Sequence, residues 1–314
     1  MSLAFLFPGQ GSQAVGMGAE LADAFGAARR IFEEVDDALD QRLSRLMREG
    51  PAEELTLTEN AQPALMAVSL AVMATLETEF GVPVTRAAFV AGHSLGEYSA
   101  LAAARALTLA DAARLLKLRG QAMQRAVPVG EGAMASLIGP KSDLALAEAA
   151  AAAGRAVGVC VVANDNNAGN IVISGAKAAV DLAIEKAKEL GARAIPLNVS
   201  APFHCPLMAP AAEEMARALA ETSLVAPTPP LVANVTARPT QDPDAVRGLL
   251  VDQVTGRVRW RESVEWLAGE GEVTSFAEVG AGKVLAGIVR RIVPDAAAVS
   301  LNGPADLEAF AKAL

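Results

Sequence analysis

The sequence predicts an α/β fold with a mainly parallel sheet, and three observations support this prediction. Short apolar runs alternate with longer alanine-rich segments, which indicates strands that alternate with helices. A Gly-x-Ser-x-Gly pattern at residues 92–96 stands between such a run and such a segment. After Val127 the order becomes β-α-β-β-α-β, which is typical of a ferredoxin-like domain. We therefore expect a ferredoxin-like small domain at residues 128–198, inserted into a large α/β domain formed by residues 1–127 and 199–314.

The large domain is predicted to begin with a buried strand at residues 3–7. Its first half should continue with helical segments within residues 19–49, a helix at 61–80, a strand at 87–91, and helices after residue 96 and at 111–126. Its second half should contain a helix at 211–219 and strands at 231–234 and 275–279. The carboxyl ends of parallel strands meet at one edge of a sheet, where ligands usually bind. We therefore expect Gln10 and Ser94 to lie there together.

The small domain is predicted from the same alternation over a shorter stretch. Its expected strands are residues 133–138, 157–162, 171–174 and 192–198, and its expected helices are residues 141–153 and 176–190. Residues 164–170 are rich in Asn and Gly, which favours a polar turn between the two central strands.

The composition argues against several classes of partner. The chain has 314 residues, of which 52% are hydrophobic and 20% charged, and its net charge is −9. This charge does not fit the basic surface that nucleic acids require. The first residues lack the basic start and apolar length of a signal peptide. The apolar segment 61–76 is interrupted by Gln62, Pro63 and Ser69, so we expect it to be too short to span a bilayer and expect no membrane association.

The cysteines and the glycine motifs indicate no cofactor. Cys160 and Cys205 are the only cysteines, too few for a disulfide framework, which favours a reducing, cytoplasmic compartment. The two cysteines and two histidines show no paired metal-ligand spacing, so no metal site is expected. The glycines at residues 9–11 and 280–283 lack the full pattern of a dinucleotide or phosphate loop.

Ser94, at the centre of the Gly-x-Ser-x-Gly pattern, is the candidate nucleophile. A sharp turn from strand to helix would hold its backbone in a strained conformation and expose its hydroxyl. Side chains at the flanking glycines would collide in so tight a turn. The amides at the start of the following helix would face any negative charge that develops beside Ser94.

His204 is the candidate base, since a serine hydroxyl attacks only when a base takes its proton. The chain has two histidines, and His93 adjoins Ser94 in the turn, so its ring should point away and have a packing role. A third group should orient the His204 imidazole. Hydrolases of this type use an acid between the serine and the histidine in chain order, but no residue there is an obvious choice. A backbone carbonyl or an amide could replace it.

Arg119 lies in the apolar stripe of its predicted helix, among Leu115, Leu116 and Met123. A guanidinium among apolar neighbours is costly unless an anion meets it. The arginine could pair with a buried Asp or Glu of the protein, or its side chain could reach the solvent. It could equally bind the carboxylate of a substrate, because its fork matches a carboxylate in two places.

An oxyanion that forms at Ser94 needs hydrogen-bond donors. The backbone amide of Leu95 is one candidate, because it directly follows the nucleophile. The loop Gly9-Gln10-Gly11, at the end of the first predicted strand, is placed to supply the second. This loop could also be an ordinary turn that ends a strand.

Taken together, these motifs resemble the malonyl-CoA:acyl carrier protein transacylases, the acyltransferase family of fatty acid and polyketide synthesis. The resemblance covers essentially the whole chain. Its signatures are residues 7–13 (Phe-Pro-Gly-Gln-Gly-Ser-Gln), 92–98 (Gly-His-Ser-Leu-Gly-Glu-Tyr), 118–120 (Leu-Arg-Gly), 132–134 (Gly-Ala-Met), 203–204 (Phe-His) and 278–283 (Glu-Val-Gly-Ala-Gly-Lys). The resemblance implies a hydrolase-like large domain and a ferredoxin-like insert.

The resemblance also implies the residue roles. Ser94 would carry the malonyl group, His204 would act as base and then as acid, and Arg119 would hold the malonate carboxylate. Gln10 and the Leu95 amide would form the oxyanion hole. A carbonyl near Gln253 would orient the histidine, and Phe203 matches the pattern of malonyl-selective members. The family also implies an enzyme that needs no metal and holds no bound cofactor.

The implied partners are malonyl-CoA and an acyl carrier protein. Carrier proteins are acidic and so is this chain, so contact should use local cations. Arg257, Arg259 and Arg261 form one acid-free run, and a second group contains Lys283, Arg290 and Arg291. Either group could be an ordinary solvated surface.

Several alternatives remain open from the sequence. The chain could be a serine thioesterase or esterase, the equivalent acyltransferase of a polyketide pathway, or a carrier-binding scaffold without activity. The lack of other domains in the sequence favours a stand-alone enzyme of a dissociated synthase.

Overall fold

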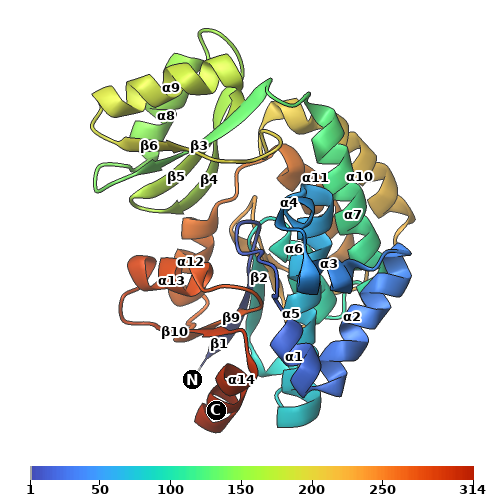
Figure 1. Ribbon diagram of the computed structural model, residues 1–314. Helices are drawn as coiled ribbons and strands as arrows, with labels where there is room; N and C mark the ends of the chain where they lie inside the picture. The colour runs from blue at the N-terminus through green and yellow to red at the C-terminus, as the bar shows by residue number, and fades with distance from the viewer. Residues whose placement is uncertain (1) are drawn as a thin grey trace.

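The structure, a computed structural model, describes residues 2–314 and contains two separate sheets (Figure 1). The larger sheet consists, in spatial order, of β10 (Ala297–Leu301), β9 (Ser275–Val279), β1 (Leu3–Phe7), β2 (Phe89–Gly92), β7 (Leu231–Ala233) and β8 (Arg238–Thr240). Its neighbours from β10 to β7 run parallel, and only the edge strand β8 is antiparallel. The predicted α/β class with a mainly parallel sheet is therefore confirmed.

Helices cover both faces of this sheet, because its strands are apolar on both sides. In β1, Leu3, Phe5 and Phe7 join the core on one face, whereas Ala4 and Leu6 join the core on the other. The first core also contains α1 (Ala19–Ala24), α2 (Gly26–Leu39), α3 (Leu43–Glu49), α4 (Ala52–Thr56), α5 (Thr58–Phe80), α6 (Gly96–Ala103), α7 (Leu109–Ala126), α10 (Ala209–Glu221), α11 (Pro243–Thr255) and α14 (Pro304–Ala313). The second core contains α12 (Trp260–Ala268) and α13 (Val284–Ile292).

Helix α5 passes through the middle of the protein and contacts α2 and α7. It has 23 residues, so the expectation that this apolar segment is too short for a bilayer is wrong. By length and composition alone, it is the single helix within residues 2–314 that could cross a membrane. However, 72% of its most apolar window is buried inside the protein, as in the core helix of a globular fold.

The smaller sheet consists, in spatial order, of β4 (Cys160–Asn167), β5 (Asn170–Ala176), β3 (Gly132–Ile138) and β6 (Arg193–Pro196), all antiparallel to their neighbours. Helix α8 (Leu144–Gly154) connects β3 to β4, and α9 (Lys177–Glu189) connects β5 to β6. The two helices and the sheet enclose a third core of their own. Figure 1 shows this unit at one end of the molecule, beyond α12 and the end of α7.

The predicted polar turn at residues 164–170 is wrong over most of its length, because β4 continues to Asn167. Its polar side chains have partners elsewhere in the protein. Asp165 is fully buried and its carboxylate pairs with Arg261, 2.8 Å away, while Asn166 bonds to His93. The backbone N–H of Asp165 donates to the carbonyl of Val258. Such partners let a polar strand pass through the interior, and they depend on residues distant in sequence.

Candidate active site

Ser94 lies in the turn between β2 and α6, at the carboxyl edge of the larger sheet. Its φ of 54° is in the left-handed region, which is strained for serine. Close backbone contacts explain the glycines on either side. A Cβ on Gly92 would lie 1.9 Å from the backbone of Gly96, and one on Gly96 would lie 2.2 Å from the carbonyl oxygen of Phe7. The predicted strand–turn–helix is present.

The side chain of Asn234 holds this turn in place from the end of β7. Its Oδ1 accepts the backbone N–H of Ser94 at 2.8 Å, and its Nδ2 donates to the carbonyl of Gly92 at 2.7 Å. Asn234 is fully buried, so both bonds are shielded from water. Two hydrogen bonds from one amide therefore stabilise the strained backbone of Ser94.

His204 reaches Ser94 from a buried position 110 residues further along the chain. Its Nε2 lies 2.8 Å from Ser94 Oγ, and its Nδ1 lies 2.8 Å from the carbonyl oxygen of Gln253. That carbonyl can only accept, so Nδ1 carries the proton and Nε2 is free to accept one from the serine. Burial, followed by the nearby charge of Arg119, lowers the pKa of His204 to about 3. The imidazole is therefore neutral at physiological pH.

His93 points away from the serine hydroxyl. Its Nε2 lies 2.9 Å from Oδ1 of Asn166 in β4, and its ring centre is 5.4 Å from that of Trp260. Burial lowers the pKa of its imidazole. The predicted packing role agrees with these contacts, which join the nucleophile turn to the smaller sheet.

Arg119 is 99% buried, with 1% of its surface exposed, and lies directly beside Ser94. Its Nη1 donates to Oε1 of Gln62 at 2.7 Å, and its Nη2 donates to Ser94 Oγ at 3.1 Å and to Oε1 of Gln253 at 2.8 Å. The guanidinium also lies 5.7 Å from the ring centre of Tyr98.

Within residues 2–314, Arg119 forms no ion pair with an Asp or Glu side chain, and its Nε has no hydrogen-bond partner. The two alternatives to a ligand site for Arg119, an internal ion pair and a solvent-exposed head group, are therefore wrong. A buried cation whose partners are all neutral is costly, and an anionic ligand would remove that cost.

A cavity of about 510 Å³ opens onto these groups. It is lined by Ser94, His204 and Arg119 together with Gln10, Gln62, Leu95, Met123, Met134, Asn164 and Phe203 and, at its mouth, Gly11, Gln13, Leu57 and Val129. Leu95 and Gln10 thus border the same space as the hydroxyl, and Oε1 of Gln10 accepts a bond from Thr58 at 3.1 Å. Met134 and Asn164 belong to the smaller sheet, so the cavity lies between the two sheets.

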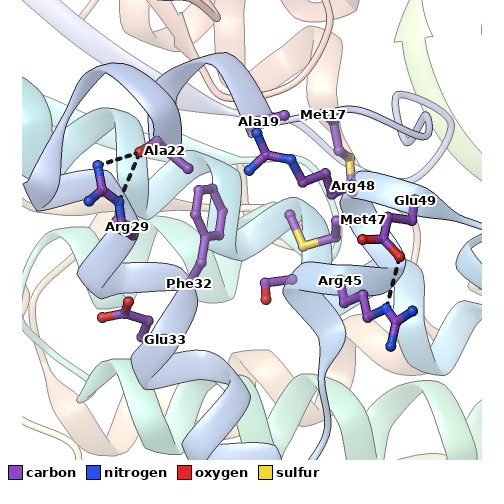
Figure 2. A pocket seen from close by; sticks show the side chains of 12 residues that line it. Met17, Ala19, Ala22, Arg29, Phe32, Glu33, Arg45, Met47, Arg48 and Glu49 are labelled. Atoms are coloured by element: carbon purple, nitrogen blue, oxygen red, sulfur yellow. Dashed lines mark hydrogen bonds and ion pairs between the residues drawn. The ribbon is translucent and has the colours of Figure 1, made fainter.

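A second hollow, of about 290 Å³, lies among α1, α2 and α3 (Figure 2). Phe32 and Met47 form its apolar floor, and Figure 2 shows arginines around them. Arg29 is bonded to the carbonyl of Ala22, and Arg45 is paired with Glu49. Because these side chains are already engaged and no nucleophile–base pair lines this hollow among the described residues, we assign it no chemistry.

The two predicted basic clusters differ. Arg257 pairs with Glu148, Arg259 with Glu262, and Arg261 with Asp165 and Glu265. The interpretation of this run as a free basic patch is therefore wrong, because the acids come from other parts of the sequence or from the next helical turn. Lys283, Arg290 and Arg291 are exposed, and in the described chain none of them is paired with a carboxylate.

Cys160 and Cys205 are both free and buried. In the part of the chain that the structure describes, no three His, Cys, Asp or Glu side chains are grouped as a metal site.

Four buried residues of the site were not singled out from residue patterns. Gln62 accepts a hydrogen bond from Arg119, and Asn234 holds the backbone of Ser94. The side chain of Gln253 accepts from Arg119 and donates to Glu97. The only signal for Gln62 is its position as a polar residue in an apolar helix. Neutral amides are common everywhere in proteins, so only the fold reveals what they contact.

Comparisons with known proteins agree with this geometry. The acyl transferase domain family matches residues 4–302. The malonyl CoA-acyl carrier protein transacylase of Bacillus subtilis strain 168 is 45% identical over 307 residues, which are 98% of this chain and 95% of that protein. The crystal structure of the acyl-carrier-protein S-malonyltransferase from Bartonella henselae has a TM-score of 0.96 and 53% identity, covering 100% of this chain and 99% of that one.

A further solved structure is described as a type II PKS acyl-carrier protein in complex with its malonyl-transacylase. It has a TM-score of 0.95 and 40% identity, and the match covers all of both chains. The family match and these relatives span nearly the whole sequence, including every residue of the site described above. The chain therefore belongs to the acyl transferase domain family.

Proposed function

We propose that this protein transfers the malonyl group from malonyl-CoA to the phosphopantetheine thiol of an acyl carrier protein, through a malonyl ester of Ser94. The observation that carries this proposal is the position of Arg119, an unpaired buried cation whose Nη2 is 3.1 Å from the hydroxyl that His204 can deprotonate. The names of the relatives, malonyl CoA-acyl carrier protein transacylase and S-malonyltransferase, support the choice of substrates.

In the first half-reaction, Ser94 Oγ attacks the thioester carbonyl of malonyl-CoA and transfers its proton to Nε2 of His204. The oxyanion is stabilised by the backbone amide of Leu95 and by Gln10, both of which border the cavity. The carbon–sulfur bond breaks, and the coenzyme A thiolate takes the proton from His204. The carbonyl of Gln253 holds the imidazole through its Nδ1–H.

The second half-reaction reverses these roles with a new thiol. His204 removes the proton of the phosphopantetheine thiol, and the resulting thiolate attacks the malonyl ester of Ser94. The carbon–oxygen bond breaks, and the proton returns from His204 to Ser94 Oγ. Each step exchanges one acyl bond for another, so the proposed reaction consumes no cofactor.

Selectivity follows from the charge of Arg119. The free carboxylate of malonate would pair with its guanidinium, whereas an acetyl or longer neutral acyl group would leave the buried charge unpaired. Phe203, which precedes the base and borders the cavity, would limit the size of the acyl group. Its bulk supports a preference for malonyl over branched malonyl groups.

We infer that the carrier protein binds over Lys283, Arg290 and Arg291. These cations are exposed, and Gly282, next to Lys283, lies against Ser12, whose neighbours Gly11 and Gln13 line the cavity. A Cβ on Gly282 would be 2.9 Å from Ser12 Oγ. Charge reversal in the double variant Lys283→Glu/Arg290→Glu should raise the KM for carrier protein several-fold and leave that for malonyl-CoA unchanged. Lys188→Glu, on the outer face of α9, is the matched control. An unchanged KM for carrier protein would exclude this surface.

The proposal extends to the two domains, the cellular compartment and the pathway of the enzyme. We propose that residues 1–127 and 199–314 form a hydrolase-like catalytic domain and residues 128–198 a ferredoxin-like domain. The separate third core and the strand order β4-β5-β3-β6 support this division. We also propose that the enzyme supplies malonyl units for fatty acid synthesis in the cytoplasm; the same chemistry would serve a polyketide pathway.

The test is the intact mass of the protein over time with malonyl-CoA and no carrier protein. A stable gain of one malonyl group, absent in Ser94→Ala and absent with acetyl-CoA, is expected. Loss of malonyl-CoA to free malonate without an adduct would indicate a hydrolase. Neither an adduct nor turnover would indicate a binding protein.

A further inference from the structure

Glu97 is the buried acid nearest the nucleophile, and the proposed mechanism does not use it. It lies three residues after Ser94, in the first turn of α6, and only 1% of its surface is exposed. Burial raises the pKa of its carboxyl group to about 8. Burial of a carboxyl group costs free energy unless hydrogen bonds satisfy its oxygens, so the partners of Glu97 are informative.

The two carboxyl oxygens of Glu97 face the side-chain amide of Gln253 and the backbone N–H of Asn234. Oε2 accepts a hydrogen bond from Nε2 of Gln253, and Oε1 is 3.4 Å from the backbone N–H of Asn234. Among the described residues, no ion pair joins Glu97 to Arg119. Glu97 is linked to the arginine through the side chain of Gln253, which is hydrogen-bonded to both.

Gln253 is the central member of this group. Its Oε1 accepts from Arg119 at 2.8 Å, its Nε2 donates to the carbonyl of Ser94 at 2.9 Å as well as to Glu97, and its own backbone carbonyl accepts from His204 at 2.8 Å. The side chain is fully buried, so water cannot replace a lost partner. If the amide turned over, its N–H groups would face the N–H groups of Arg119, and its oxygen would face the carbonyl of Ser94.

We propose that Glu97 is a positioning residue for malonyl transfer. Its carboxyl oxygen keeps the amide of Gln253 in the one orientation that presents an acceptor to Arg119, and this places the guanidinium where it meets the substrate carboxylate. A carboxyl group can present an acceptor oxygen to Gln253 Nε2 in either protonation state, because its protonated form still has a carbonyl oxygen. The proposal rests on the function proposed above.

The test uses two substitutions of similar volume. Glu97→Met removes the acceptor for Gln253 Nε2, and we expect it to raise the KM for malonyl-CoA about tenfold, since recognition of the carboxylate is weakened both before and during reaction. The kcat should change less than about twofold. Glu97→Gln keeps an acceptor oxygen and should recover most of the loss. The ratio of malonyl to acetyl transfer should fall in Glu97→Met in the same proportion.

A double-mutant cycle separates positioning from general support of the fold. If Glu97 acts through Gln253, the double variant Glu97→Met/Gln253→Met should have the same malonyl-CoA KM as Gln253→Met alone. Glu278→Gln is the matched control, because Glu278 is equally buried but contacts α13 instead of the site. It should change the melting temperature and leave the malonyl-to-acetyl ratio unchanged.

Each outcome bears on one proposal. If the wild-type protein forms no malonyl adduct, the proposed function fails before Glu97 is tested. If the wild type is malonylated and Glu97→Met keeps its KM and its malonyl-to-acetyl ratio, or if the two substitutions are additive, the positioning role is wrong. Should Glu97→Met fail to fold, Glu97→Gln decides by the same ratio, with an expected fall of two- to threefold and no fall counting against the role.

Discussion

Two strand–turn–helix units at the same edge of the larger sheet use a buried glutamate in opposite ways. In the unit β9–α13, Glu278 accepts the N–H groups of Leu285 and Ala286 at 3.0 and 2.9 Å, so the carboxylate occupies the start of the helix. In the unit β2–α6, Glu97 is in the first turn of the helix, but its carboxyl group contacts Gln253 and the backbone N–H of Asn234 instead of the first N–H groups of α6. The start of α6 therefore borders the cavity.

The difference shows how one local design serves either stability or chemistry. A helix N-terminus attracts negative charge. Glu278 satisfies that attraction permanently in α13, so the start of this helix has a structural role. In α6 the attraction remains for the oxyanion that we expect beside Ser94, and the turn is held by side chains from elsewhere, such as Asn234.

The first prediction concerns the tight turn of β2–α6. Gly96→Ala would place a Cβ 2.2 Å from the carbonyl oxygen of Phe7, in rigid backbone that cannot yield cheaply. We expect the free energy of unfolding to fall by about 3 kcal/mol or more, as measured by urea denaturation. Acylation of Ser94 should be lost in any protein that still folds. A variant with wild-type stability and activity would mean that the turn relaxes easily and that the contrast with β9–α13 is unfounded.

The second prediction compares the buried Arg119 with the partly exposed Arg261. Arg261 already has the carboxylate of Asp165 at 2.8 Å, whereas Arg119 has only neutral partners. Arg119→Met should lower kcat/KM for malonyl-CoA by roughly 100-fold, equivalent to about 3 kcal/mol, because the substrate carboxylate loses its charged partner.

The matched control is Arg261→Met, which should lower the melting temperature because Asp165 is left buried and unpaired. Its preference for malonyl over acetyl groups should stay at the wild-type value. Equal losses of malonyl transfer in both variants would show that Arg119 supports the fold instead of binding the substrate.

The third prediction is a pH dependence of stability with opposite signs for two residues. The folded-state pKa of Glu97, about 8, is above its ordinary value, so the folded protein holds a proton that the unfolded chain has released. The stability associated with Glu97 is therefore lost as the pH rises towards 8, by up to about 1.4 kcal/mol per pH unit. The folded-state pKa of His204, about 3, is below its ordinary value, so its contribution is lost as the pH falls below about 6.5.

Urea denaturation at pH 5, 6, 7 and 8 measures both effects. The difference in unfolding free energy between wild type and Glu97→Gln should decline with rising pH. The difference between wild type and His204→Gln should instead rise from pH 5 to about 6.5 and then level off. If the unfolding free energies of all three proteins changed with pH in parallel, neither group would have a shifted pKa.

The sequence predicted much of this site, because a few of its residue types are rare or out of place. His204 stood out because only two histidines exist, and Arg119 because a charge interrupts an apolar stripe. Both lie within hydrogen-bond distance of Ser94. The oxyanion-hole role of the Leu95 amide and of the loop with Gln10 was argued from their places beside Ser94 and the first strand. The roles of Phe203 and Gln253 came from the family resemblance, and all four stay predictions.

Two of the errors, the predicted turn at residues 164–170 and the free basic run, arise mainly from partners distant in sequence. The strand containing Asp165 looked like a turn because its polar residues are satisfied by Arg261 and His93, about 100 and 70 residues away in sequence. Likewise Arg257 looked free because its partner Glu148 lies in α8, 109 residues away in sequence. Composition and periodicity report local preference, whereas a buried ion pair is a property of the assembled fold.

The smallest effect is expected in the structural unit. Gly287 lies within α13, and a Cβ built there would meet nothing within 4 Å. Gly287→Ala should therefore raise the free energy of unfolding by about 0.5–1 kcal/mol, because alanine loses less backbone entropy in a helix. Malonyl transfer should be unchanged, since the helix start is already occupied by Glu278. A loss of activity with this stable variant would show that α13 must move during the reaction. Both units, β2–α6 and β9–α13, would then take part in catalysis.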